Sequence, residues 1–264
     1  MGRMDLGLHG RKGVVLAASR GLGRAIALEL AREGAALAIA SRNEARIAEA
    51  ADAIAAETGR RPLHRVVDVT QKEPLEAFIR ESAEALGGLH MLVCNAGGPP
   101  AGRFDQLDDE AWIQAFNLNL MSVVRAIRAA RPYLEAEGGS ILIITSMSVK
   151  QPLPGLILSN AFRPAVTGLA KTLSQELAPR IRINCLAPGR LDTERVRELD
   201  AIKAEQSGIP VEEVRRQTAA AIPLGRYGDP AELGRLAAFL LSDAASYVTG
   251  QTILVDGGLS VTLA

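Results

Sequence analysis

The sequence predicts an α/β fold with a Rossmann-type, doubly wound parallel sheet of about seven strands and helices on both faces. Three observations predict it. Short, continuously apolar runs recur along the chain, as they do in strands that are buried on both faces. Longer amphipathic stretches alternate with these runs, which indicates repeated βα units. A glycine-containing turn follows the first apolar run and precedes the first amphipathic stretch, where such folds bind phosphate.

The expected elements alternate in order. Strands are expected over 13–18, 37–41, 63–69, 90–97 (ending in a turn), 140–146, 181–189 and 251–258. Helices are expected over about 22–33, 43–58, 73–86, 109–135, 161–178, 194–220 and 230–242. The first three βα units are typical of one mononucleotide-binding half and the later units of the other. Because no long linker or low-complexity tract interrupts this order, we expect residues 1–264 to form a single dinucleotide-binding domain.

Composition narrows the classes of function. The 30 Lys and Arg residues balance 30 Asp and Glu, which argues against a nucleic-acid partner or an anionic membrane surface. No apolar run approaches the roughly 18 residues that span a bilayer. The two cysteines, Cys94 and Cys185, are far apart in the sequence and are expected to be free thiols in a reducing compartment. We therefore expect a cytoplasmic protein with a small-molecule substrate and no metal site.

The turn after the first strand is a candidate phosphate-binding loop. It reads Ser19-Arg20-Gly21-Leu22-Gly23. Glycines at this turn let the backbone approach a pyrophosphate and let the helix pack on the strand, and the helix N-terminus offers free N–H groups. A tight turn without a ligand is the alternative for a GxG sequence taken by itself.

This loop resembles the GxxxGxG loop of the short-chain dehydrogenase/reductase family, with Ala17 in place of the first glycine. A methyl group there is expected to reduce the closeness of the cofactor phosphates. The resemblance extends along nearly the whole chain, and within the family it is nearest to the 3-oxoacyl-[acyl-carrier-protein] reductase branch. It implies further cofactor-binding residues at Asp68 and Val69 beside the adenine, at Asn95, Ala96 and Gly97 in the turn after the fourth strand, and at Pro188, Gly189 and Thr193 near the nicotinamide.

The residues after the second strand predict which dinucleotide binds. Sites that prefer NAD usually place an acidic residue there to bind the ribose 2′-hydroxyl. This sequence has Ser41, Arg42 and Asn43 instead. Arg42 and Arg20 are expected to converge on a 2′-phosphate, which guanidinium groups bind well. The alternative is that Arg42 only caps a solvated loop; the prediction is NADP(H).

The family resemblance implies a catalytic set of Asn, Ser, Tyr and Lys, and this chain departs from it. Asn119 and Ser146 match the first two. Thirteen residues after Ser146, where the tyrosine is expected, stands Ser159, and four residues later Arg163 replaces the lysine. A serine hydroxyl is far less acidic than a phenol, and arginine does not deprotonate at neutral pH. Neither residue can inherit the role of the one it replaces.

Two functions remain open. The first is an oxidoreductase that reduces a carbonyl, including 3-oxoacyl thioesters, or oxidises the matching alcohol. Ser146 would then hold the carbonyl oxygen, Arg163 would bind the nicotinamide ribose, and a water or Ser159 would relay the proton. The second is an NADP(H)-binding, catalytically silent sensor or a partner for an active relative. A retuned site for another reaction, such as a dehydration, is a third possibility.

Residues 194–222 resemble the mobile substrate lid of the family, with an ordinary solvated helix pair as the alternative. The last strand and the helix before it resemble the family's oligomer surfaces, so a homo-oligomer, a dimer or a tetramer, is expected.

Overall fold

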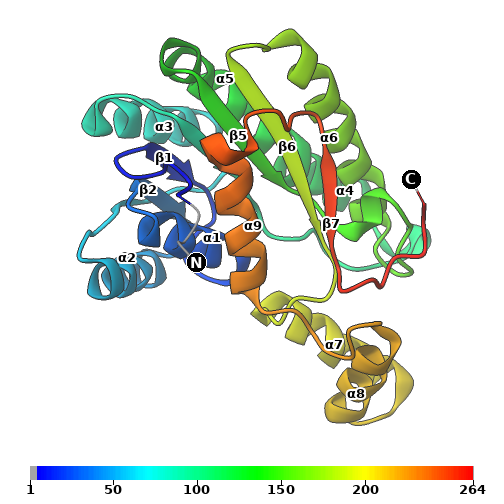
Figure 1. Ribbon diagram of the computed structural model, residues 1–264. Coiled ribbons are helices and arrows are strands. Elements are labelled where there is room, and N and C mark those ends of the chain that lie inside the picture. The colour runs from blue at the N-terminus through cyan, green and yellow to red at the C-terminus, as the bar shows by residue number, and fades with distance from the viewer. Residues whose placement is uncertain (1–4, 264) are drawn as a thin grey trace.

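The computed structural model describes residues 5–263 and is built on one parallel sheet of seven strands (Figure 1). The strands are β1 (Lys12–Val15), β2 (Ala36–Ser41), β3 (Leu63–Val66), β4 (Met91–Cys94), β5 (Gly139–Ile144), β6 (Ile181–Pro188) and β7 (Thr252–Val255). Their spatial order is β3-β2-β1-β4-β5-β6-β7. The chain thus winds outward from β1 to one edge, returns to β4 and winds to the other edge, which confirms the doubly wound sheet.

Helices cover both faces of the sheet (Figure 1). The helices are α1 (Gly21–Arg32), α2 (Glu44–Thr58), α3 (Lys72–Leu86), α4 (Asp109–Phe116), α5 (Ser122–Glu137), α6 (Ile157–Glu176), α7 (Glu194–Ser207), α8 (Val211–Ala221) and α9 (Pro230–Leu241). Buried residues of α1, α2 and α9 form one apolar cluster with the sheet, and those of α3, α5 and α6 form the other. Strands enclosed in this way read as continuous apolar runs, as observed.

Several predicted boundaries were wrong in informative ways. The strand expected over 13–18 ends at Val15, because the residues after it turn away to form the phosphate-loop region. The helix expected over 109–135 is divided by a π-helical turn at Asn117–Met121. The helix expected over 194–220 is two helices, since Gly208 takes a left-handed conformation that ends α7 and Pro210 follows.

The start of α6 is the correction that matters most for function. It begins at Ile157 and not near residue 161, because Leu158 is apolar and packs into the core. Ser159 and Arg163 therefore lie on the same helix, one turn apart, and both are buried. The side chains are fixed by helix packing and do not belong to a flexible loop.

The strand order also determines where a site can form. The connections from β1 and from β4 leave the carboxyl edge of the sheet in opposite directions, and ligands of open α/β sheets bind in the crevice between such connections. The loops that follow β1, β4, β5 and β6 all begin at this edge. Nearly all of the predicted site residues lie on these loops or on the helices that follow them.

Candidate functional site

The loop between β1 and α1 has the close packing that a phosphate-binding turn needs. Gly21 has a φ of 57° and begins α1. A Cβ atom on Gly23 would lie 2.4 Å from the Ala17 carbonyl oxygen and 2.6 Å from Asn95 Nδ2. No larger residue fits there without moving α1 away from the loop, so Gly23 is required by the packing of the helix on the strand.

Ala17 carries a conformational strain that was not predicted. Its φ is 49°, the only positive φ among the described residues other than glycine. For an alanine this left-handed region costs roughly 1–2 kcal/mol. The first position of the GxxxGxG pattern therefore has a left-handed backbone conformation, and in this chain a strained alanine adopts it.

Asn95 joins the two loops at the crevice. Its Nδ2 group donates to the carbonyl oxygens of Leu16 at 3.3 Å and Ala17 at 3.2 Å. Ala96 and Gly97 follow it in the turn after β4. The Asn95 side chain therefore holds the β4 turn against the loop after β1.

The residues predicted to bind the adenosine part of the cofactor are only partly brought together in the structure. Asp68 Oδ1 accepts hydrogen bonds from the backbone N and the Oγ1 of Thr70, at 2.9 and 2.8 Å, and the neighbouring Val69 is buried. Arg42 is exposed at the end of β2. Arg20 forms an ion pair with Glu194 at the start of α7. Its convergence with Arg42 on a 2′-phosphate therefore stays a prediction.

Ser159 is joined to a residue that the sequence did not single out. Its Oγ lies 3.1 Å from Ser148 Oγ, and both side chains are buried. Ser146, the predicted carbonyl-binding serine, accepts a hydrogen bond at Oγ from the Ser148 backbone N at 3.2 Å. The three serines thus form one cluster between the loop after β5 and α6. The spacing Ser146-Met147-Ser148 was the only sequence signal for the third member.

Arg163 is a buried cation with few partners. Its Nη1 donates to the Ile144 carbonyl oxygen at 2.7 Å, and its Nε has no protein partner. Burial lowers the pKa of Arg163 to about 10, so the side chain stays protonated at neutral pH. It is therefore a fixed positive charge inside the fold, at the end of β5.

Asn119 shares a small cavity with Arg163. It lies in the π-helical turn, where its Nδ2 donates to the Ala115 carbonyl oxygen at 3.0 Å and its buried Oδ1 has no protein partner. Asn95 and Ala96 line the same cavity, which has a volume of about 10 Å³. That space is close to the minimum for one water molecule. The unpaired Asn119 Oδ1 and Arg163 Nε are suitable partners for such a molecule.

The loop after β6 supplies the last predicted residues. A Cβ on Gly189 would lie 2.6 Å from Asp256 Cβ, so the Pro188-Gly189 turn packs closely on the chain after β7. Thr193 caps α7, accepting a hydrogen bond at Oγ1 from the Val196 backbone N at 3.3 Å. The threonine is thus held at the crevice by the first turn of α7.

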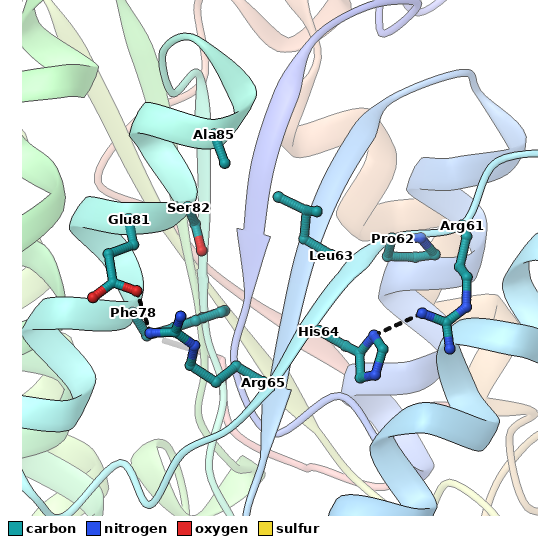
Figure 2. A pocket seen from close by; sticks show the side chains of 9 residues that line it. All are labelled: Arg61, Pro62, Leu63, His64, Arg65, Phe78, Glu81, Ser82 and Ala85. Carbon is teal, nitrogen blue, oxygen red and sulfur yellow. Dashed lines mark hydrogen bonds and ion pairs between the residues drawn. The ribbon is translucent and has the colours of Figure 1, made fainter.

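A larger groove lies elsewhere, between β3 and α3 (Figure 2). It has a volume of about 490 Å³, and none of the predicted site residues line it. Its charged groups are paired: Arg65 with Glu81, and Arg61 with Asp52, which lies outside the groove, while Arg61 also forms a hydrogen bond with His64. The groove therefore presents little unpaired charge to a ligand.

Residues 5–263 contain neither a metal-binding cluster nor a membrane-spanning helix. That part of the chain contains no group of three or more His, Cys, Asp or Glu side chains placed to hold a metal ion. It also contains no helix that is long and apolar enough to cross a membrane.

Comparison with known proteins identifies the family. A family model described as enoyl-(acyl carrier protein) reductase matches residues 16–260. The 3-oxoacyl-[acyl-carrier-protein] reductase FabG of Chlamydia trachomatis is 31% identical over 255 residues, which cover 96% of this chain and 98% of the relative. The chain belongs to the short-chain dehydrogenase/reductase family, as its motifs indicated.

Solved structures agree with this assignment. The L-sorbose reductase of Gluconobacter frateurii, complexed with NADPH and L-sorbose, superposes with a TM-score of 0.93 at 32% identity, covering 98% of this chain and 100% of that one. A short-chain oxidoreductase of Pseudomonas aeruginosa, bound to NADPH and described as containing an atypical catalytic center, gives a TM-score of 0.87 at 32% identity and covers 96% and 97% of the two chains. Family members with unusual catalytic centres therefore include at least one that binds NADPH.

Proposed function

We propose that this protein is an NADP(H)-dependent oxidoreductase that reduces a carbonyl, of the 3-oxoacyl type, or oxidises the matching alcohol. The observation that carries the proposal is the closely packed junction of Gly23, Ala17 and Asn95 at the carboxyl edge of the sheet. NADPH bound in two structural neighbours, and a third that is described as an NADPH dependent reductase, support the choice of cofactor. The ketoreductase and reductase relatives support the direction of the chemistry.

The proposed cofactor site uses the loops after β1, β2, β3, β4 and β6. Its residues are Ser19, Arg20, Gly21, Leu22, Gly23, Arg42, Asp68, Val69, Asn95, Ala96, Gly97, Pro188, Gly189 and Thr193. The donor set fits the group: N–H groups at the start of α1 suit a pyrophosphate, and arginines suit a 2′-phosphate. When bound, the cofactor supplies the hydride.

In the proposed chemistry the protein stabilises the negative charge that develops on the substrate oxygen and delivers a proton to it. Hydride addition to a carbonyl carbon leaves an alkoxide that must gain a proton. The Ser146 hydroxyl would donate a hydrogen bond to that oxygen, and the fixed charge of Arg163 would stabilise its negative charge. A water or the Ser159 hydroxyl would relay the proton, and Ser148 holds the Ser159 hydroxyl in place. Asn119 would anchor a relay water through its unpaired Oδ1.

The silent-protein alternative has one observation in its favour. The hydroxyls of Ser159 and Ser148 lie within hydrogen-bond distance of each other, and Arg163 is bound to a backbone carbonyl. Both groups thus already have partners within the protein. A protein that binds NADP(H) without turnover would look the same here. The double variant Ser159→Tyr with Arg163→Lys would then gain a ketone reductase activity that the parent lacks.

Turnover separates the two functions. The purified protein is mixed with NADPH and a panel of ketones that includes 3-oxoacyl thioesters, and the loss of absorbance at the reduced nicotinamide band is followed. We expect cofactor oxidation with at least one substrate and its loss in Ser146→Ala. Tight NADPH binding without turnover on any substrate would overturn the oxidoreductase function in favour of the silent one.

The remaining parts of the proposal concern organisation. Residues 1–264 would act as one dinucleotide-binding domain, with 194–222 as a lid over the substrate. A cytoplasmic location is supported by two buried free thiols, Cys94 and Cys185. A homo-oligomer, a dimer or a tetramer, is supported by the position of β7 at the edge of the sheet and by the exposed Ile113 and Phe116 of α4.

A further inference from the structure

The first turn of α7 lies against the proposed phosphate-binding loop. Glu194, its first residue, forms an ion pair with Arg20 of that loop. A Cβ atom added to Gly21 would lie only 3.6 Å from Thr193 Cγ2. Residues far apart in the sequence are therefore in contact at the point where a pyrophosphate would approach α1.

The next residue of α7 binds the other wall of the crevice. Arg195 Nη2 donates to the Pro99 carbonyl oxygen at 2.8 Å, in the loop that follows β4. A Cβ on Gly98 would lie 3.2 Å from Arg195 Nε, so the side chain packs along this loop. Glu194 and Arg195 together connect α7 to both loops between which a dinucleotide would lie.

The middle of α7 is held much more firmly than its first turn. Asp200 is buried, and its carboxylate accepts hydrogen bonds from Arg190 at 3.3 Å, Arg215 at 3.1 Å and the Tyr227 hydroxyl at 2.9 Å. These partners lie in the loop after β6, in α8 and in the segment before α9. In contrast, the side chains of Arg20 and Glu194 are 46% and 52% exposed. The exposed contacts can therefore open while the buried anchor stays formed.

We propose that the first turn of α7 is a strap across the cofactor crevice, in which Glu194 competes with the phosphates of the dinucleotide for Arg20. This inference rests on the proposed binding of NADP(H). The Glu194 carboxylate occupies Nη1 of Arg20, so a phosphate that binds the guanidinium through both Nη groups must displace it. Cofactor binding must therefore break the Arg20–Glu194 pair, and the pair lowers the affinity of the free protein for the cofactor.

The test is the dissociation constant of NADPH for Glu194→Gln, measured by the fluorescence of the reduced nicotinamide at low ionic strength. We expect binding that is about twofold to fivefold tighter than that of the parent, the range for losing one exposed competing pair. The gain should shrink at high salt, since exposed pairs are screened. Glu205→Gln is the matched control: it removes the same charge from an exposed position on the same helix and should leave the constant unchanged.

A double-variant cycle tests whether the change in NADPH affinity caused by Glu194→Gln depends on Arg20. In an Arg20→Gln background, Glu194→Gln should change the dissociation constant no further. A parallel titration with NADH identifies the phosphate involved: a gain with NADPH alone indicates the 2′-phosphate, and a gain with both indicates the pyrophosphate. Thermal unfolding of each variant verifies that the fold is intact.

The outcomes separate the strap from the function it rests on. If the parent binds NADPH and Glu194→Gln binds equally or more weakly, the strap inference is overturned and the proposed function stands. If neither the parent nor any variant binds NADPH or NADH, the proposed function fails, and the strap inference with it.

Discussion

The phosphate-binding side and the proposed catalytic side of the crevice are constrained by different features of the structure. On the phosphate side the constraints are steric: Gly23 has no room for a side chain, and Asn95 links two loops through backbone carbonyls. On the proposed catalytic side, α6 fixes the positions of Ser159 and Arg163, at which the sequence resemblance implies a tyrosine and a lysine in the family. The phosphate side is therefore constrained by the space available to the backbone, and the catalytic side by the chemistry of the two side chains that α6 holds.

The largest expected effect is on the catalytic side. Ser146→Ala should lower kcat about 10²- to 10³-fold, the usual loss when one donor to a developing oxyanion is removed. The dissociation constant of NADPH should be unchanged, since the hydroxyl is not proposed to bind the cofactor. Steady-state kinetics and fluorescence titration check the two parts.

Ser148→Ala is the matched control for that variant. It removes a neighbouring buried hydroxyl that bonds to Ser159 and that we do not expect to face the substrate. Its loss of kcat should be much smaller. Equal losses in the two variants would mean that the whole serine cluster acts as a unit.

On the phosphate side, Gly23→Ala should act through packing. The new methyl group would overlap the Ala17 carbonyl and the Asn95 amide, and overpacking of this kind costs about 1–3 kcal/mol of unfolding free energy. NADPH binding should be lost as α1 moves. Urea unfolding and titration measure both; full NADPH affinity in this variant would contradict the tight-junction account.

Burial of the Arg163 charge is expected to lower the stability of the fold in a pH-dependent way, while the same charge is proposed to support turnover. Its pKa in the folded protein, about 10, lies below the ordinary value of 12.5 because burial disfavours the charge. The destabilisation is therefore fully present below pH 10 and is relieved as the pH rises through 10 toward 12.5. Arg163→Met removes this cost, so it should unfold at equal or higher urea concentration than the parent at pH 7.

That stability advantage of Arg163→Met should decrease as the pH rises above about 10, as the parent begins to lose its buried charge. Its turnover should nevertheless fall sharply, since the fixed charge near the substrate oxygen is gone. Retained turnover in a stable Arg163→Met protein would show that the charge has no catalytic role.

The smallest expected effect is at the strained position. Ala17→Gly relieves the left-handed conformation of an alanine, and the added flexibility of the unfolded chain offsets part of the gain. We expect unfolding free energy to rise by about 0.5–1 kcal/mol, with somewhat tighter NADPH binding. A loss of stability would show that the φ of residue 17 is not a source of strain.

Sequence reasoning predicted the seven-stranded sheet and the order of its βα units, because these depend on periodicity and spacing. The phosphate-binding role of the loop after β1 and the register of Ser159 and Arg163 stay predictions. Sequence reasoning did not predict that Ser159 lies against Ser148, since that contact depends on where α6 begins. It also missed the Arg20–Glu194 pair and the buried Asp200. Residues 20 and 194 are brought together only by the fold, and Asp200 lies in a helix rich in exposed charges that gives no sign of its burial.

The central claim is that Ser146 and Arg163 support reduction on an intact NADP(H) site. The most direct test is transfer of deuterium from NADPH labelled at nicotinamide C4 to a panel of ketones, read by mass spectrometry of the alcohols. We expect one deuterium at the carbinol carbon with the parent protein, and labelling about 10²- to 10³-fold slower with Ser146→Ala. Bound NADPH with no labelled alcohol from any substrate would contradict this claim.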